Sequence, residues 1–227
     1  MWRFSGLGTV VFSVLLTACV MNTPPLYESR ARAYLERRGV DEAVIQRLTG
    51  GQPLRPADVQ ILLQYQDTAT LFLLASNKST PADIVEKLAA SDDLEVRWGA
   101  ARNPKLSVDT MARLRTPGKY STMNDYLARN PSIPLDVLRD MYQSKEAGKE
   151  SIAMNPSCPP DLVDAILADQ PEEVRLWLSF NRGLGPAAWT RLEADPSPRV
   201  VRMLQSNPAY VRWKKDQAPR EPHRPGG

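Results

Sequence analysis

The chain has 227 residues, of which 24% are charged and 42% apolar, a composition typical of a soluble globular protein of one or two domains and unlike that of a disordered chain or an integral membrane bundle. Its 29 Lys and Arg residues exceed its 26 Asp and Glu residues by only three, too few for a dedicated nucleic-acid binder. Cys19, Cys158 and His223 are its only cysteines and histidine, so it lacks the residues for a disulfide framework, a metal centre built from cysteines or histidines, or a catalytic triad. We therefore expect no cofactor, no metal and no enzymatic activity.

The N-terminus has the pattern of an export signal. An uncharged apolar run from Leu7 to Leu16 follows Arg3 and leads to Thr17-Ala18-Cys19. The run is too short for a comfortable membrane span, and small residues follow it where a signal peptidase cleaves. Leu16-Thr17-Ala18-Cys19 resembles the bacterial lipobox, which implies that residues 1–18 are removed and Cys19 is lipidated. By the same analogy, Val20 favours anchoring to the outer membrane, facing the periplasm; the alternative is an ordinary signal peptide.

A repeat with a period near 26 residues occupies most of the remaining chain. Asparagine recurs at intervals of 25 to 27 residues, at Asn77, Asn103, Asn130, Asn155, Asn181 and Asn207. An apolar or alanine residue stands three positions before each Asn, and apolar residues stand eight and eleven positions after the first five. These spacings predict helices with one buried stripe. Two positions before the first five Asn stands Ala or Ser, which suits close approach by the neighbouring repeat.

Prolines mark the boundaries within each repeat. Four of the six Asn precede Pro, which disfavours the α conformation in the residue before it and so ends the first helix. Another proline often stands four residues after the Asn, at Pro81, Pro134 and Pro159, where it is suited to the start of a second helix. Each repeat is therefore a helix, a tight turn, a short second helix and a loop. We predict an all-α fold, an α-solenoid of about five to six two-helix repeats over residues 71–211.

Residues 96–104 and 128–138 show this pattern fully and resemble the leucine-rich repeat variant family. The resemblance covers about residues 71–211 and implies alternating α and 3₁₀ helices stacked into a right-handed superhelix. Asn77 and Asn181 depart from the pattern because Lys78 and Arg182 follow them, and the repeats are slightly longer than is usual in the family. The iron–sulfur module of the founding type is not implied, since the chain has no cysteine cluster.

The segments that flank the repeats differ in composition. Residues 19–26 are expected to form a lipidated linker and residues 27–70 an N-terminal helical cap, with helices over 27–38 and 41–48 and a degenerate repeat that begins at Pro56. Residues 212–227 are basic and rich in Pro and Gly, which predicts a disordered tail. Trp213 is a candidate to close the last repeat.

Recurrent side chains supply the candidate sites. Arg97 and Arg175 stand six positions before an Asn, and Arg102 and Arg129 stand immediately before one. Residues at a fixed phase form a column along a solenoid, so these arginines are candidates to bind an acidic partner; alternatively they line a solvated face paired with nearby acids.

The remaining recurrent residues are assigned to structure. We assign the Asn residues to turns rather than to binding, and Trp98, Trp177 and Trp189 to packing between repeats. Cys158 stands at the start of a second helix, where a capping or packing role competes with that of a reactive thiol.

Two functions from different classes fit this sequence. The first is a non-enzymatic scaffold, lipid-anchored in the periplasm, that binds an envelope protein through one solenoid face, as an assembly factor or as an immunity protein that neutralises a toxin. The second is a binder of, or enzyme acting on, an anionic envelope polymer such as peptidoglycan or lipopolysaccharide, with the arginine column as its anion clamp.

Overall fold

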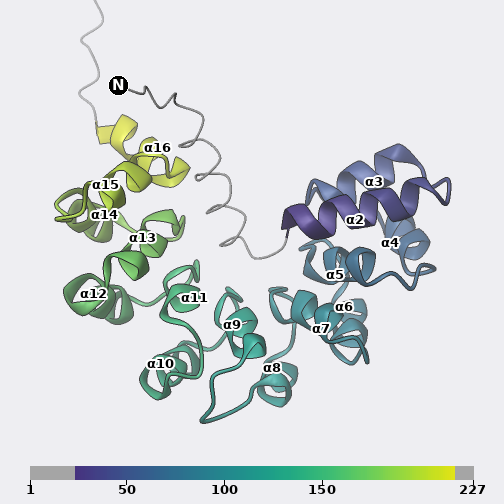
Figure 1. Ribbon diagram of the computed structural model, residues 1–227, viewed down its shortest axis with the longest axis horizontal. Coiled ribbons are helices and arrows are strands. Elements are labelled where there is room, and N and C mark those ends of the chain that lie inside the picture. The colour runs from purple at the N-terminus through teal and green to yellow at the C-terminus, as the bar shows by residue number, and fades with distance from the viewer. Residues whose placement is uncertain (1–23, 218–227) are drawn as a thin grey trace, which may run out of the picture. The chain divides into compact units, whose positions relative to one another are not determined.

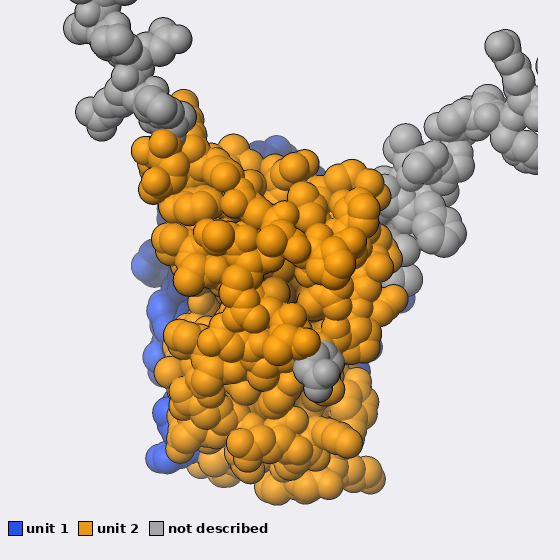
Figure 2. All heavy atoms as spheres, turned by 90° about the vertical axis from the view of Figure 1, so that its left-hand side faces the viewer, with its two compact units in different colours: residues 1–110 blue, residues 111–227 orange. Residues whose placement is uncertain are grey.

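The computed structural model describes residues 24–217, so the expected signal peptide, the lipidation site Cys19 and residues 218–227 lie outside the described residues. Between residues 24 and 217 the regular elements are fifteen α-helices, without a β-strand. The all-α fold expected from the sequence is therefore confirmed. The chain divides into two compact units, with the boundary between Thr110 and Met111 (Figure 2).

The first unit begins with three helices in the region where the sequence predicts a helical cap. Helices α2 (Pro24–Glu36) and α3 (Glu42–Thr49) are separated by a turn at Gly39, and α4 (Pro56–Leu62) follows a turn at Gly51. Both glycines have left-handed φ angles, +69° and +62°, which glycine adopts without steric cost. Helix α2 packs on α5 (Thr68–Ser76), where the ring of Tyr27 stacks on that of Phe72 with centroids 4.1 Å apart. The cap thus covers the apolar face of the first regular repeat.

The rest of the first unit consists of helix pairs. Helix α5 pairs with α6 (Ala82–Ala89), and α7 (Leu94–Ala101) is followed by α8 (Val108–Leu114), within which the boundary between the two units falls. Helix α7 packs against both α5 and α6, so the second repeat is stacked on the first. Aspartates cap the first helices: Asp67 accepts a hydrogen bond from the Thr70 amide, and Asp93 accepts one from the Glu95 amide.

The second unit continues the same alternation (Figure 1). Its first helices are α9 (Thr122–Ala128), α11 (Lys149–Ala153), α13 (Glu172–Phe180) and α15 (Pro198–Gln205), and each contacts the next. Its second helices are α10 (Leu135–Ser144), α12 (Pro160–Asp169), α14 (Pro186–Glu193) and α16 (Pro208–Gln217). In Figure 1, α10 and α12 lie along the side of this unit opposite to α11 and α13. The unit is therefore a two-layer stack.

The core follows the phase of the repeats. The residues three positions before the Asn are fully buried, and so are most of those eleven positions after it: Leu74, Ala100, Leu127, Ile152, Leu178 and Leu204, then Met141, Ile166 and Leu192. The small residues two positions before the Asn are buried in five repeats, whereas the last repeat has the exposed Gln205 at this position. The stack therefore ends at α15, where α16 covers it.

Two expectations about the helices are corrected. The second helices are α-helical over seven to ten residues, not the 3₁₀ helices that the family resemblance implies. Runs of this length with an apolar stripe exceed what the poorer hydrogen bonds of a 3₁₀ helix sustain. The expected tail at 212–227 is also wrong in its start, because α16 extends to Gln217: Tyr210 and Trp213 pack on Trp189 and order this segment.

Candidate binding surface

The recurrent Asn residues are buried and link successive repeats. The side-chain amide of Asn103 donates to the carbonyl oxygens of Ala75 and Asn77, at 2.7 and 2.9 Å. Its Oδ1 accepts a hydrogen bond from the Lys105 amide at 2.9 Å, which fixes the turn after α7. The same three bonds recur at Asn155, Asn181 and Asn207. These side chains satisfy buried backbone groups and are not available to a ligand.

The candidate arginines are largely engaged within the fold. Arg175 donates to both carboxylate oxygens of Asp195, at 2.7 and 3.1 Å, and to the carbonyl oxygen of Gln170. Burial acts to raise the pKa of Asp195, but the hydrogen bonds from Arg175 and from the Ser197 amide hold this pKa below its ordinary value. The side chain of Asp195 is 3% exposed, so Arg175 neutralises a buried charge instead of presenting one to a partner.

The other three arginines are also partly buried. Arg97 donates to the carbonyl oxygens of Ser91 and Asp92, in the loop before its own helix. Arg129 donates to the Ser151 hydroxyl of the next repeat at 3.2 Å, and Arg102 is the C-terminal cap of α7. Arg97 and Arg175 are therefore bonded to groups of the fold itself, which makes the arginine column a weaker candidate for a binding surface.

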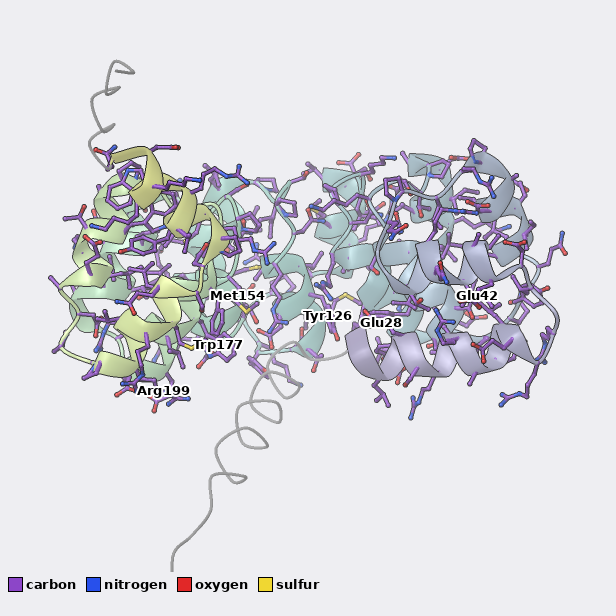
Figure 3. The ribbon with its side chains drawn as sticks, turned by 90° about the horizontal axis from the view of Figure 1, so that it is seen from above. Glu28, Glu42, Tyr126, Met154, Trp177 and Arg199 are labelled. Atoms are coloured by element: carbon purple, nitrogen blue, oxygen red, sulfur yellow. The ribbon has the colours of Figure 1, made fainter. Side chains whose placement is uncertain are left out.

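A half-buried apolar surface on the first helices of the second unit is the stronger candidate. It consists of Met154 at the end of α11, Trp177 and Phe180 on α13, and Met203 on α15, and is called the aromatic–methionine face below. The rings of Trp177 and Phe180 stack with centroids 5.5 Å apart, and three of the four side chains, those of Trp177, Phe180 and Met203, pack on the buried core. In Figure 3, Arg199, Trp177, Met154 and Tyr126 follow one another along this unit.

The opposite layer of the second unit has a different character, because its exposed charges pair across repeats. Arg139 on α10 donates to both oxygens of Asp161 on α12, at 2.7 and 2.9 Å. Asp164, also on α12, pairs in turn with Arg191 on α14. Charged groups that already pair offer little to a further ligand, whereas large apolar side chains left partly in water favour a protein partner.

Trp189, a possible site of ligand stacking, and Cys158, a possible reactive thiol, both have structural roles. Trp189 is 7% exposed and contacts Trp213, with ring centroids 5.4 Å apart, so the expectation that Trp213 closes the stack agrees with the structure. Burial raises the pKa of the Cys158 thiol to about 12, and nearby Asp161 acts in the same direction. The thiol therefore remains protonated at neutral pH, which opposes the role of a nucleophile.

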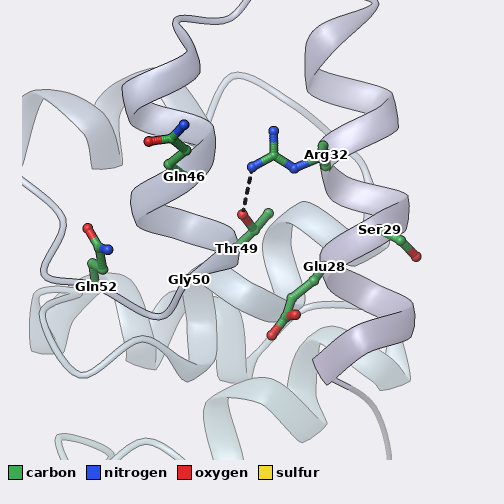
Figure 4. A pocket seen from close by; sticks show the side chains of 7 residues that line it. All are labelled: Glu28, Ser29, Arg32, Gln46, Thr49, Gly50 and Gln52. Atoms are coloured by element: carbon green, nitrogen blue, oxygen red, sulfur yellow. Dashed lines mark hydrogen bonds between the residues drawn. The ribbon is translucent and has the colours of Figure 1, made fainter.

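A shallow depression of about 560 Å³ lies between α2 and α3 in the first unit (Figure 4). Burial raises the pKa of Glu28 at its edge. Its cation, Arg32, already pairs with Glu36 at 3.2 Å and with Glu42 at 2.8 Å, and donates to the Thr49 hydroxyl at 3.4 Å. The cation of the depression is therefore already paired with carboxylates of the fold.

The described part of the chain contains no cluster of three or more His, Cys, Asp or Glu residues placed to hold a metal ion. Within residues 24–217, none of the helices combines the length and the hydropathy that a bilayer span needs. Comparisons with protein-family models, with curated proteins and with solved structures gave no match for this chain.

Sequence reasoning identified the correct repeat but not this surface. Arg102, Arg129, Met154 and Phe180 all stand immediately before a recurrent Asn, a position that is half-buried or exposed in all six repeats. The change from Arg to Met and Phe along the chain was the available signal. The interpretation of the arginines as a column and of Trp177 as a packing residue does not use this signal.

Proposed function

We propose that this chain is a non-enzymatic scaffold that binds a protein partner through the aromatic–methionine face. The observation that carries this proposal is that Met154, Trp177, Phe180 and Met203 are only half-buried and lie on neighbouring helices. Aromatic and Met side chains dominate the energetic centres of protein interfaces because they bury large apolar areas. The rigid helix pairs beneath them hold the four side chains in place before the partner binds.

We further propose that the scaffold is attached by lipid at Cys19 to the outer membrane and faces the periplasm. This part rests on the apolar run and Leu16-Thr17-Ala18-Cys19 in the sequence alone. Two or three acyl chains hold a protein at a bilayer far more firmly than one. A palmitate-labelled product that disappears with Cys19→Ala supports the anchor, and an unlabelled protein released into the soluble fraction contradicts it.

The interface is tested by crosslinking in envelope membranes. We compare the wild-type chain with Trp177→Ala/Phe180→Ala, and use Leu135→Ala/Val211→Ala as the matched control, since Leu135 and Val211 are 41% and 48% exposed but lie outside the face. The proposal expects one protein, at a fixed ratio, captured by the wild type and the control and lost with the face variant. Capture should persist at about 0.5 M salt, because an apolar interface is not screened by ions.

The opposite result would favour the polymer binder. Recovery of peptidoglycan or lipopolysaccharide instead of a protein, retained by the Trp177→Ala/Phe180→Ala variant and lost at high salt, contradicts the scaffold. Circular dichroism of each variant shows whether its fold is retained, so that a lost partner is not mistaken for an unfolded chain.

A further inference from the structure

The depression between α2 and α3 contains a carboxylate that lacks a counter-charge. Glu28 lies on α2 and is half-buried. In Figure 4 its side chain points from α2 toward the end of α3, where Thr49 and Gly50 lie. Burial raises the pKa of Glu28, and no cation or hydrogen-bond donor among residues 24–217 acts against this shift. Glu28 is therefore an acid held partly out of water without the partner that such a group requires.

The charge around the depression is negative. Among the described residues that line it, Arg32 is the one cation, and it already pairs with Glu36 and Glu42. Together with Glu28, these acids bring three negative charges against the one positive charge of Arg32. The C-terminal end of α3, toward which Glu28 points, carries the partial negative charge of a helix dipole. The depression therefore favours a positively charged ligand.

Neutral polar groups line the other side of the depression. Figure 4 shows Gln46 and Gln52 on the side of α3 and Glu28 on the side of α2. The Nε2 of Gln46 donates to Glu42 at 3.0 Å, and its Oε1 remains an acceptor. A primary amide both donates and accepts, so it is matched by an amide group of a ligand. The volume of about 560 Å³ is within the range of pockets for small ligands.

We propose that this depression binds an elongated ligand with a primary ammonium group at one end and amide groups at the other, the chemistry of a lysine residue in a peptide. The ammonium group pairs with Glu28 beside the end of α3, and the amide groups exchange hydrogen bonds with Gln46 and Gln52. An ammonium group donates in three directions, which suits a carboxylate next to the carbonyl end of a helix. The flexible carbon stem of lysine separates this group from the backbone amides.

The position of Glu28 gives α2 two roles. Tyr27, the preceding residue, is buried and stacks on Phe72 of α5. Successive side chains of an α-helix point about 100° apart, so the residue that anchors α2 to the stack also orients Glu28 beside α3. The site uses none of the residues of the aromatic–methionine face. Failure of the proposed partner interface would therefore leave this inference intact, and the converse also holds.

The test is an NMR titration of the full chain with Nα-acetyl-lysine methylamide. The same compound acetylated on its side-chain nitrogen serves as the neutral probe. The Thr49 methyl signal and the side-chain amide signals of Gln46 and Gln52 report binding at the site. We expect a dissociation constant of about 1 mM for the charged probe, because an ion pair in a shallow, solvated depression is weak.

Two variants separate an ion pair at Glu28 from general attraction by net charge. Glu28→Gln removes the proposed partner of the ammonium group. Glu36→Gln is the matched control, because it makes the same change of charge on the same helix and leaves Arg32 its bond to Glu42. Circular dichroism shows that both variants retain the fold.

We expect Glu28→Gln to weaken binding of the charged probe at least about tenfold and Glu36→Gln to weaken it less than about threefold. The neutral probe should bind the wild type at least about tenfold more weakly than the charged probe. Equal weakening by the two variants overturns the proposal, because net charge then holds the probe. Equal binding of the two probes also overturns it, and so does a wild-type chain whose reporter signals do not shift.

Discussion

The side-chain amide of Asn181 donates to the backbone carbonyl oxygen of Asn155, one repeat earlier, at 2.7 Å. Its second proton goes to the carbonyl oxygen of Ala153 at 2.8 Å, and its Oδ1 accepts from the Gly183 amide at 2.8 Å. Asparagine alone combines two donors and a neutral acceptor on so short a side chain. Its recurrence is therefore explained by the backbone groups left open where each first helix ends.

Replacement of this residue tests the argument. Asn181→Ala removes the donor to the Ala153 carbonyl oxygen and the acceptor of the Gly183 amide, and leaves the Asn155 carbonyl oxygen only its bond from the Cys158 amide. We expect this to lower the free energy of unfolding by about 3 kcal/mol. Asn181→Asp retains the acceptor but loses both donors and buries a charge, so at pH 7 it should be at least as damaging. Urea denaturation measures both. A loss below about 1 kcal/mol for Asn181→Ala would show that water replaces the side chain.

The turn after Asn181 also depends on a glycine. A Cβ on Gly183 would lie 2.7 Å from the carbonyl carbon of Pro156 and closer still to its oxygen, so the two repeats would have to separate. We expect Gly183→Ala to lower the free energy of unfolding by about 2 kcal/mol or more. Gly185→Ala is the control, because a Cβ there meets no atom within 4 Å. Its effect should stay within about 1 kcal/mol. Equal effects of the two substitutions would contradict the close approach.

The order of the helices was predictable from the sequence because it depends on local spacing. Apolar residues at intervals of three and four, Asn before Pro and glycine at a positive φ act within a few residues of each other. The positions of Leu178 in the core and of Asn181 at a helix end follow from this spacing alone. The cap helices around Gly39 and Gly51 were predictable for the same reason.

The partners of the side chains were not predictable, because they arise from stacking. Arg175 meets Asp195, which is 20 residues away and belongs to the next repeat. Periodicity places both residues at fixed phases but does not show how far one repeat is rotated on the next. For the same reason the sequence assigned Asn181 to a turn and did not reveal its bonds to the previous repeat. Exposure of Phe180 and Met154 likewise depends on which side of a first helix a neighbour covers.

A buried aspartate in the cap gives a prediction about pH. Asp58 is fully buried, and hydrogen bonds from Arg47, at 2.8 and 2.9 Å, and from Arg55 hold its pKa well below the ordinary value of 3.8. Because the folded-state pKa is depressed, the ionised carboxylate stabilises the fold above pH 3.8, and this contribution is lost as the pH falls through the folded-state pKa.

Asp58→Asn should therefore lower the free energy of unfolding at about pH 6. It should also make this free energy fall less steeply from about pH 5 to about pH 2, a range that includes the ordinary pKa of a carboxylate. Denaturant unfolding at several pH values measures both effects. Asp92→Asn, at an exposed position, serves as the control and should follow the wild-type curve. An Asp58→Asn variant with an unchanged acid limb would contradict the assignment of that limb to Asp58.

The thiol of Cys158 should be unreactive in the folded chain. Because its pKa is about 12, the ionised fraction of this thiol at pH 8 is far smaller than that of an ordinary cysteine. We expect a disulfide reagent to modify it at least 100-fold more slowly than a free thiol, and at the ordinary rate in denaturant. Ser157→Cys in a Cys158→Ser background places a thiol at the neighbouring exposed position and should react fast. Rapid modification of native Cys158 would restore it as a candidate nucleophile.

The last prediction tests whether Arg175 stabilises the fold or contacts a partner. Its removal leaves Asp195, 3% exposed, without its ion pair, so Arg175→Ala should lower the free energy of unfolding of the isolated protein by about 3 kcal/mol. Arg139→Ala, which breaks an exposed pair with Asp161, should leave stability nearly unchanged.

Asp195→Asn should restore part of the stability of Arg175→Ala, because the buried charge is then removed as well. Thermal unfolding of the two single variants and the double variant measures this coupling. If Arg175→Ala alone unfolds like the wild type, Arg175 returns as a candidate contact for an acidic partner.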